Sequence, residues 1–161
     1  LNTSPKIPVI RHALFQAEKF YNKKFQIIVD LDATSPLRRV EDILNAYKFF
    51  INKKANFLVT GCKSKKNPYF NIIEIINNKV QVVKKLKKNI YRRQDAPITY
   101  DCNGSIYIYN RKSLINFKSY FTRKTVFYKM PENRSIDIDS ELDFKLVEFL
   151  LKKKNYKKLL G

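Results

Sequence analysis

A strand–helix–strand pattern in the first 61 residues constrains the fold of this chain more than any other feature. Residues 25–31 and 56–61 are short runs rich in β-branched and apolar residues, as is typical of strands that are buried on both faces. Between these runs, apolar residues recur at helical spacing from Val40 to Phe50, and Ser35 suits the N-cap of that helix. Two strands joined through a helix by short loops predict a βαβ unit and a parallel sheet.

Helical and strand patterns continue through the rest of the chain, and no internal repeat or flexible linker interrupts them. The alternation between residues 69 and 83, around the Asn77-Asn78 turn, is typical of an antiparallel hairpin. The other predicted elements are strands over 104–110 and 125–129, a helix over 7–21, and a helix over 141–154 that begins with the capping-box pair Ser140 and Asp143. We therefore predict one α/β domain over residues 1–161, with a mostly parallel sheet and an antiparallel region inserted at 63–124.

The chain carries a formal net charge of +19, from 33 Lys and Arg against 14 Asp and Glu. Such a surface attracts any polyanion, whether nucleic acid, nucleotide or membrane surface. Much of the charge comes from lysines in surface-like runs, so charge alone does not favour a nucleic-acid function. Apolar residues make up 44% of the sequence, which excludes a disordered chain, and no apolar run approaches the roughly 20 residues of a membrane helix. We expect a soluble, cytoplasmic protein with no membrane partner.

Two acidic features follow or accompany predicted extended segments. Asp30 and Asp32 end the first strand, at the carboxyl edge where ligands bind in open parallel sheets. Asp137 and Asp139 alternate in an extended segment, so their side chains are expected on one face with Cα atoms about 6.5–7 Å apart. At that spacing two carboxylates can share one Mg²⁺, while phosphate oxygens and waters complete its octahedron. The alternative interpretation is a solvated edge strand that leads into a capped helix.

A third feature combines Arg92 and Arg93 with a loop that Pro97 makes rigid. Two guanidinium groups beside such a loop suit the binding of a carboxylate or a phosphate, although surface arginines before a turn are common. The aromatic pair Tyr120 and Phe121 could form a platform for a ligand, but such pairs are more often part of a core. Each of these features is a weak signal when it is taken alone.

Taken together, four motifs resemble the acylneuraminate cytidylyltransferase family, the CMP-sialic acid synthetases. They occur in the family's order and at its spacing, over nearly the whole chain. The motifs are Asp30-Leu31-Asp32-Ala33-Thr34-Ser35-Pro36-Leu37-Arg38, Arg93-Gln94-Asp95-Ala96-Pro97, Asn103-Gly104-Ser105-Ile106-Tyr107 and Ser135-Ile136-Asp137-Ile138-Asp139. The resemblance implies a Rossmann-like fold of the nucleotide-diphospho-sugar transferase type. It also implies a homodimer in which the inserted antiparallel region, residues 63–124, reaches over the neighbour's active site.

By the same resemblance, the expected enzyme moves CMP from CTP to the anomeric hydroxyl of a nine-carbon, sialic-acid-like nonulosonic acid and releases pyrophosphate. The sugar acid would be of the N-acetylneuraminic, legionaminic or pseudaminic type. Asp137 and Asp139 are the implied catalytic residues and the implied ligands of Mg²⁺. The implied substrate-binding residues are Asp32, Thr34, Ser35, Arg93, Gln94, Asn103, Tyr107, Tyr120 and Phe121. Alignment of the reactants and neutralisation of phosphate charge account for catalysis of such a transfer.

Two sequence differences bear on the substrate. The chain has Asp32-Ala33 where synthetases for N-acetylneuraminic acid usually have Gln-Pro, and Asp101 where they tend to have a basic residue. A carboxylate in place of an amide or a cation changes which sugar groups can be satisfied. Together with residues 67–71, these differences favour the branch that acts on legionaminic acid.

The family's Gly/Ser/Lys-rich loop holds the phosphates of CTP through backbone N–H groups at a helix start, and this sequence contains no counterpart of it. We therefore expect the chain to be the C-terminal part of one cytidylyltransferase domain, without the N-terminal nucleotide-binding segment and inactive on its own. Two alternatives of another class stay open. One is a basic domain that binds polyanions or nucleic acid, and the other is a non-catalytic dimerisation module that retains the fold.

Overall fold

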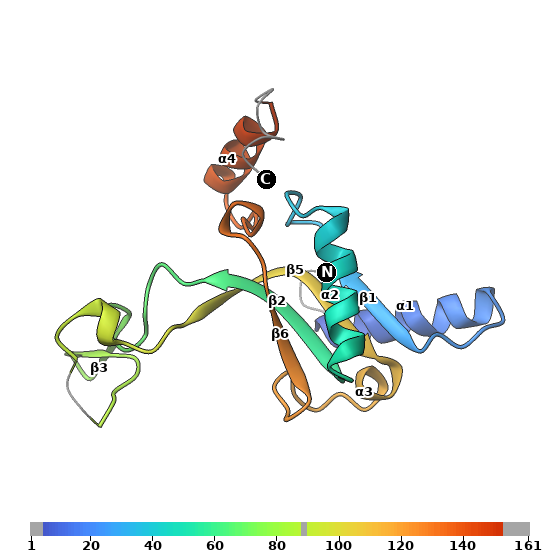
Figure 1. Cartoon of the computed structure of the whole chain (residues 1–161), viewed down its shortest axis with the longest axis horizontal. Coiled ribbons are helices and arrows are strands. Elements are labelled where there is room, and N and C mark those ends of the chain that lie inside the picture. The colour runs from blue at the N-terminus through green and yellow to red at the C-terminus, as the bar shows by residue number, and fades with distance from the viewer. Residues whose placement is uncertain (1–4, 88–89, 153–161) are drawn as a thin grey trace. The chain divides into compact units, whose positions relative to one another are not determined.

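Residues 5–87 and 90–152 are described by the computed structural model (Figure 1). They divide into two compact units, one built from the residues up to Gly61 together with those from Cys102 onward, and the other from Cys62–Asp101. The first unit contains helices α1 (Lys6–Phe20), α2 (Val40–Asn52), α3 (Arg111–Ile115) and α4 (Glu141–Lys152), and most of strands β1 (Ile27–Leu31), β2 (Phe57–Lys63), β5 (Tyr100–Asn110) and β6 (Thr125–Lys129). The predicted α/β class is therefore confirmed.

These four strands form one sheet in the order β1-β5-β2-β6. β1 runs antiparallel to β5, whereas β2 and β6 are parallel. β5 also runs against β2, because the nitrogen of Asn110 donates to the oxygen of Asn56 at one end and the nitrogen of Ile106 donates to Oγ1 of Thr60 at the other. β1, β2 and β6 thus share one direction, as the predicted mostly parallel sheet requires. The two strands of the predicted βαβ unit are not neighbours, since β5 lies between them.

Helices cover both faces of this sheet, and β2 is buried on both sides as predicted. The prediction was wrong for β1, which lies at the edge of the sheet with Val29 and Leu31 exposed. On one face, Ala46 and Phe50 of α2 pack with Leu58, Ile106 and Ile108. On the other face, Ile7 and Leu14 of α1 pack with residues of the opposite alternation, namely Phe57, Val59 and Tyr109. Each fully buried aliphatic side chain of this kind stabilises the fold by about 1.5–3 kcal/mol. The core is therefore two apolar layers separated by the sheet.

The start of α2 differs from the prediction. The helix begins at Val40, and the backbone nitrogen of Arg39 donates to Asp42 at 2.9 Å, so Arg39 rather than Ser35 holds the cap position. Ser35 is buried and its hydroxyl bonds a distant segment instead. At α4 the predicted capping box is confirmed, because the nitrogen of Asp143 donates to Ser140. The last two residues of that predicted helix, 153 and 154, lie outside the described residues.

The second unit contains the predicted hairpin. β3 (Ile73–Ile76) and β4 (Lys79–Val82) pair antiparallel. Asn77 and Asn78 join them with φ values of 50° and 61°, the left-handed conformation that a tight two-residue turn needs and that Asn tolerates. The hairpin prediction is confirmed. The wider inserted region at 63–124 and its role in dimerisation stay predictions. In the described ranges, no helix has both the length and the hydrophobicity to cross a membrane.

Candidate functional site

The loop after β1 is folded back on itself by one arginine. Nη1 of Arg38 donates to the backbone oxygens of Asp32 at 2.5 Å, Ser35 at 3.0 Å and Ser105 at 3.2 Å. A guanidinium with several donors suits this clustering of carbonyl oxygens. Arg38 therefore fixes the Asp32–Ser35 loop against the start of β5.

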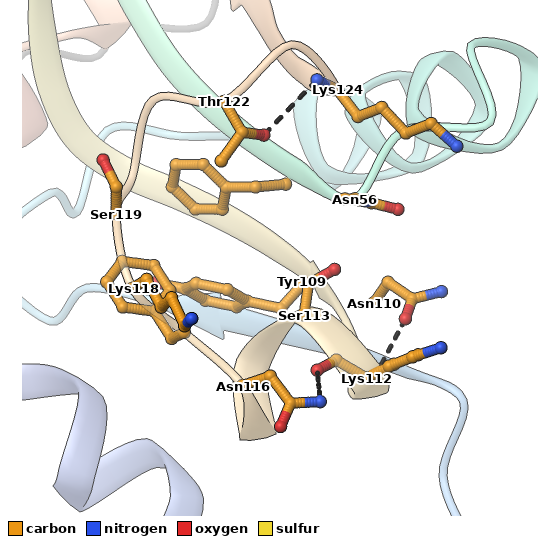
Figure 2. A pocket seen from close by; sticks show the side chains of 12 residues that line it. Asn56, Tyr109, Asn110, Lys112, Ser113, Asn116, Lys118, Ser119, Thr122 and Lys124 are labelled. Atoms are coloured by element: carbon orange, nitrogen blue, oxygen red, sulfur yellow. Dashed lines mark hydrogen bonds between the residues drawn. The ribbon is translucent and has the colours of Figure 1, made fainter.

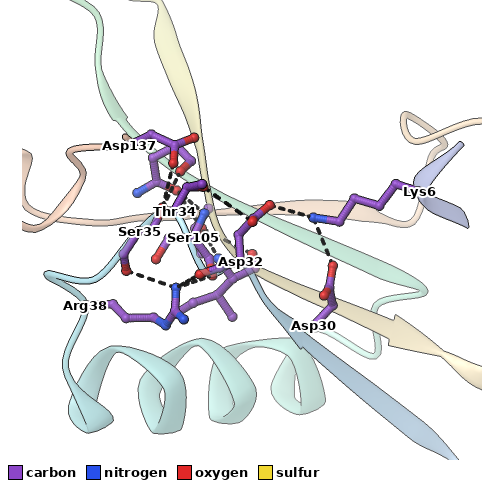
Figure 3. Close-up of polar contacts among 11 residues, drawn as sticks. Lys6, Asp30, Asp32, Thr34, Ser35, Arg38, Ser105 and Asp137 are labelled. Atoms are coloured by element: carbon purple, nitrogen blue, oxygen red, sulfur yellow. Dashed lines mark hydrogen bonds and ion pairs between the residues drawn. The ribbon is translucent and has the colours of Figure 1, made fainter. Parts of the chain in front are cut away.

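Three of the predicted site segments meet at this loop (Figure 3). The hydroxyl of Ser35 lies 3.1 Å from the backbone oxygen of Asn103 and 3.4 Å from Oδ1 of Asp137. The backbone nitrogen of Ile138 donates to the oxygen of Thr34 at 2.9 Å. Residues that are distant in the sequence thus come together at the carboxyl end of β1, the edge at which open α/β sheets bind ligands.

Asn103 is buried and uses both ends of its amide within the protein. Its Oδ1 accepts from Oγ1 of Thr60 at 2.8 Å and from the nitrogen of Ser105 at 3.2 Å, while its Nδ2 donates to Oγ of Ser135 at 3.0 Å. Only 4% of the residue is exposed. The side chain therefore ties β2 and β5 to the turn that precedes Asp137. Its predicted contact with a sugar stays a prediction.

Gly104 lies at the centre of a group that we call the Gly104 cluster, made of Asp32, Gly104, Tyr107 and Asp137. Gly104 has a φ of 62°, and a Cβ at this position would lie 3.2 Å from Oδ2 of Asp137, 3.8 Å from the hydroxyl of Tyr107 and 3.9 Å from Oδ2 of Asp32. Two carboxylates and a phenol thus converge on one point beside the backbone. A glycine is needed there both for the left-handed conformation and for the close approach of Asp137.

Lys6 is a member of the site that the sequence analysis missed. Its Nζ lies 3.0 Å from Oδ2 of Asp30, 3.0 Å from Oδ2 of Asp32 and 4.1 Å from the ring centroid of Tyr107. Burial would lower the pKa of Lys6, but its bonds to Asp32 and Asp30 outweigh that effect and raise it. Burial would likewise raise the pKa of Asp32, but Lys6 holds it below its usual value. No motif signalled Lys6, because it is one basic residue among 33.

The other predicted site residues of the first unit differ in how far their side chains are exposed. Asp139 is exposed and lies two residues after Asp137, in a segment without regular secondary structure. The predicted aromatic pair divides into a packed ring and an exposed one. The ring of Tyr120 lies 5.5 Å from that of Phe57 and 4.6 Å from that of Phe117, whereas Phe121 is 72% exposed. Tyr120 belongs to the same apolar layer as Tyr107.

Arg93 and Gln94 belong to the second unit. They line a cavity of about 380 Å³ there, together with Asn67, Pro97 and others. Arg93 donates to the backbone oxygen of Lys65, and the amide of buried Asn67 donates to the oxygen of Pro97 at 2.8 Å. The loop that was predicted to be rigid is therefore held by side-chain bonds as well as by its proline.

Another cavity, of about 550 Å³, lies beside the start of β2 and the end of β5 (Figure 2). It is bordered by Asn56 at the start of β2 and by residues of α3 such as Lys112 and Ser113. None of the predicted site residues lines it. Among residues 5–87 and 90–152, no group of three or more His, Cys, Asp or Glu side chains is arranged to hold a metal ion. A metal at Asp137 and Asp139 would therefore need further ligands from substrate and water.

No family model matches the chain, but comparison with known proteins finds several relatives. The chain is 44% identical over 154 residues to post-translational flagellin modification protein B of Campylobacter coli. The aligned region covers 96% of this chain and 65% of that protein. The chain is 46% identical over 150 residues to CMP-N,N'-diacetyllegionaminic acid synthase of Campylobacter jejuni, covering 93% and 63%. It is 31% identical over 120 residues to N-acylneuraminate cytidylyltransferase of Streptococcus agalactiae, covering 74% and 29%. The chain thus spans just under two thirds of the length of the first two relatives.

Proposed function

Since the chain belongs to the acylneuraminate cytidylyltransferase family, we propose that the protein transfers CMP from CTP to the anomeric hydroxyl of a nonulosonic acid and releases pyrophosphate. The observation that carries this proposal is the meeting of Ser35, Asn103 and Asp137 at the ligand-binding edge of the sheet. The names of the relatives support the same class of reaction. They do not favour the alternative of a non-catalytic basic domain that binds polyanions or nucleic acid.

Asp137 and Asp139 are proposed to hold a divalent cation, Mg²⁺. Their carboxylates fit this ion, because hard oxygen donors are its preferred ligands and it usually keeps several waters and substrate phosphates. When bound, the ion would neutralise charge on the phosphates of CTP as pyrophosphate leaves. The Ser35 hydroxyl donates to the backbone oxygen of Asn103 at 3.1 Å, and Oδ1 of Asp137 lies 3.4 Å from the same hydroxyl. These contacts support a role for Ser35 in keeping the two loops together beside Asp137.

The sugar acid is proposed to contact the Asp32–Ser35 loop and Tyr107, close to the point on which the Gly104 cluster converges. The predicted sugar contacts of Arg93, Gln94, Asn103, Tyr120 and Phe121 remain part of this proposal. A legionaminic acid is the favoured substrate, because the relative named for N,N'-diacetyllegionaminic acid is 46% identical, against 31% for the N-acylneuraminate enzyme. A Rossmann-like fold, a homodimer formed through the inserted region and a cytoplasmic location complete the proposal.

Pyrophosphate release in the presence of CTP and Mg²⁺ tests this function. N-acetylneuraminic, legionaminic and pseudaminic acids would be offered in turn to this chain and to the protein that its gene encodes. We expect release by the encoded protein, fastest with a legionaminic acid. If a folded encoded protein releases no pyrophosphate with any of the three acids, the proposed activity is wrong. Release that is fastest with N-acetylneuraminic acid would overturn only the substrate assignment.

A further inference from the structure

The ammonium group of Lys6 has three partners within the protein. It lies between the carboxylates of Asp30 and Asp32, 3.0 Å from one oxygen of each (Figure 3). It also lies over the ring of Tyr107, 4.1 Å from the centroid. Of these contacts, the one with Asp32 is a hydrogen bond, the one with Asp30 is an ion pair, and the one with Tyr107 is a cation–π contact. The side chain is only 35% exposed. Lys6 is therefore built into the site and does not extend freely into solvent.

The local charge around Lys6 is negative although the protein as a whole is strongly basic. One ammonium group is matched by the two carboxylates of Asp30 and Asp32. A third carboxylate, that of Asp137, approaches the same point beside Gly104 as Asp32 does. A lysine that is already balanced in this way has little net attraction for a phosphate.

We propose that Lys6 is a positioning residue for the sugar acid, which fixes the carboxylate of Asp32 and the ring of Tyr107, and that it does not bind the phosphates of CTP. This inference rests on the proposed function, in which Asp32 and Tyr107 contact the sugar. No sequence motif and no name of a relative assigns a role to this helix residue.

The physical reason is that Lys6 links two groups that would otherwise separate. Without the ammonium group, the carboxylates of Asp30 and Asp32 lie close together with no cation between them, and like charges at such range repel. Without Lys6, the carboxylate of Asp32 keeps bonds from Thr34 alone, one from its backbone nitrogen and one from its hydroxyl at 3.4 Å, which is long for a hydroxyl donor. Asp32 would then be less firmly held toward Tyr107, and the face of Tyr107 would lose its cation. Both changes alter the surface that is proposed to meet the sugar, and neither removes a proposed ligand of the metal ion.

Steady-state kinetics of Lys6→Met in the encoded protein test the proposal, because Met keeps the apolar length of the side chain and removes its charge. We expect the KM for the sugar acid to rise about tenfold, the effect of losing one charge-assisted bond, while the KM for CTP changes less than about twofold. Lys6→Arg keeps the cation, so we expect it to hold the KM for the sugar acid within about threefold of the wild type. Lys19→Met is the matched control, because Lys19 is an exposed lysine of the same helix.

A double-mutant cycle tests whether Lys6 acts through Asp32. In a protein that already carries Asp32→Asn, adding Lys6→Met should raise the KM for the sugar acid less than about twofold further, because the bond is already lost. The cycle is repeated for the free energy of unfolding, which reports on the contact without any activity. A rise in the KM for CTP that equals the rise for the sugar acid, or a loss of stability with neither KM changed, overturns the proposal. A wild-type protein that releases no pyrophosphate contradicts the proposed function itself, and this inference with it.

Discussion

The backbone nitrogen of Ile138 donates to the backbone oxygen of Thr34 at 2.9 Å, and this bond joins the two loops that carry the proposed catalytic and substrate-binding residues. Because the bond is between main-chain atoms, it does not depend on the side chain of Asp137. A substitution at Asp137 can therefore remove the charge of its carboxylate without breaking the bond that holds its loop.

Asp137→Asn should abolish transfer with little change in stability. Asn keeps the shape of Asp but removes the negative charge proposed to hold the metal ion. We expect activity to fall by about 100-fold or more, while the free energy of unfolding changes by less than about 1 kcal/mol. Pyrophosphate release and urea unfolding measure the two effects. Glu41→Gln, an exposed carboxylate of α2, serves as the control, and equal loss of activity in both variants would contradict the role of Asp137.

Asn103→Ala should destabilise the protein by about 2 kcal/mol, because it leaves the nitrogen of Ser105 without its acceptor and removes the bonds of the buried amide to Thr60 and Ser135. Urea unfolding monitored by circular dichroism gives the difference. Asn116→Ala removes an exposed amide that donates to the oxygen of Lys112, and it should cost less than about 0.5 kcal/mol. A similar cost for the two variants would show that the amide of Asn103 has no special structural role.

The ion pair between Arg134 and Asp42 holds the turn that precedes Asp137 against the start of α2. Nη2 of Arg134 lies 2.9 Å from Oδ1 of Asp42, and the two side chains are 14% and 3% exposed. Arg134→Met leaves a buried carboxylate without this cation and should cost about 3 kcal/mol in the free energy of unfolding. Lys145→Met breaks an exposed pair with Glu141 at 2.7 Å and should cost less than about 1 kcal/mol. If the order of the two costs is reversed, the assignment of a structural role to Arg134 is wrong.

Glu18 should make the fold sensitive to acid. Arg111 donates to both carboxylate oxygens, at 2.7 and 2.9 Å, and this pair lowers the pKa of Glu18 from 4.5 to about 2. A carboxyl group whose pKa is lower in the folded state stabilises the fold above its unfolded pKa. That contribution is lost as the pH falls from 4.5 toward 2.

The Glu18→Gln variant should therefore lose less stability than the wild type over the same interval of pH. Urea unfolding at a series of pH values from neutral to acid measures the slope. Glu148→Gln, on the exposed surface of α4, should keep the slope of the wild type. If Glu18→Gln also keeps that slope, Glu18 is not responsible for the sensitivity to acid.

Local patterns predicted the elements of this fold well, because their causes lie within a few residues. The two Asn residues of the hairpin turn, the capping pair Ser140 and Asp143, and the doubly apolar runs of β1 and β2 all give signals that do not depend on distant parts of the chain. The position of β5 gives no such signal. Its place between β1 and β2 results from pairing with strands that lie far away in the sequence.

The same distinction between local patterns and distant contacts explains which features of the candidate site were predicted. The motifs predicted Ser35, Asn103 and Asp137, and the structure brings them together, but the cap role of Ser35 was wrong. Its hydroxyl bonds the oxygen of Asn103, 68 positions away, instead of the nearby helix. Lys6 was missed for a related reason, since its partners are 24 and 26 positions away and no spacing rule connects them.

The central position of β5 also governs when the protein can fold. On the ribosome, β1, α2 and β2 are complete before residue 100 is made, yet the strand that must join them has not been synthesised. Until Asn110 has emerged, the inner edges of β1 and β2 and the apolar layers on both faces lack their main partner. Pairings of such large sequence separation form slowly, and exposed edges aggregate. β1 and β2 can therefore be joined in one sheet only after β5 has been synthesised, and a nascent chain that ends before β5 exposes strand edges that favour aggregation.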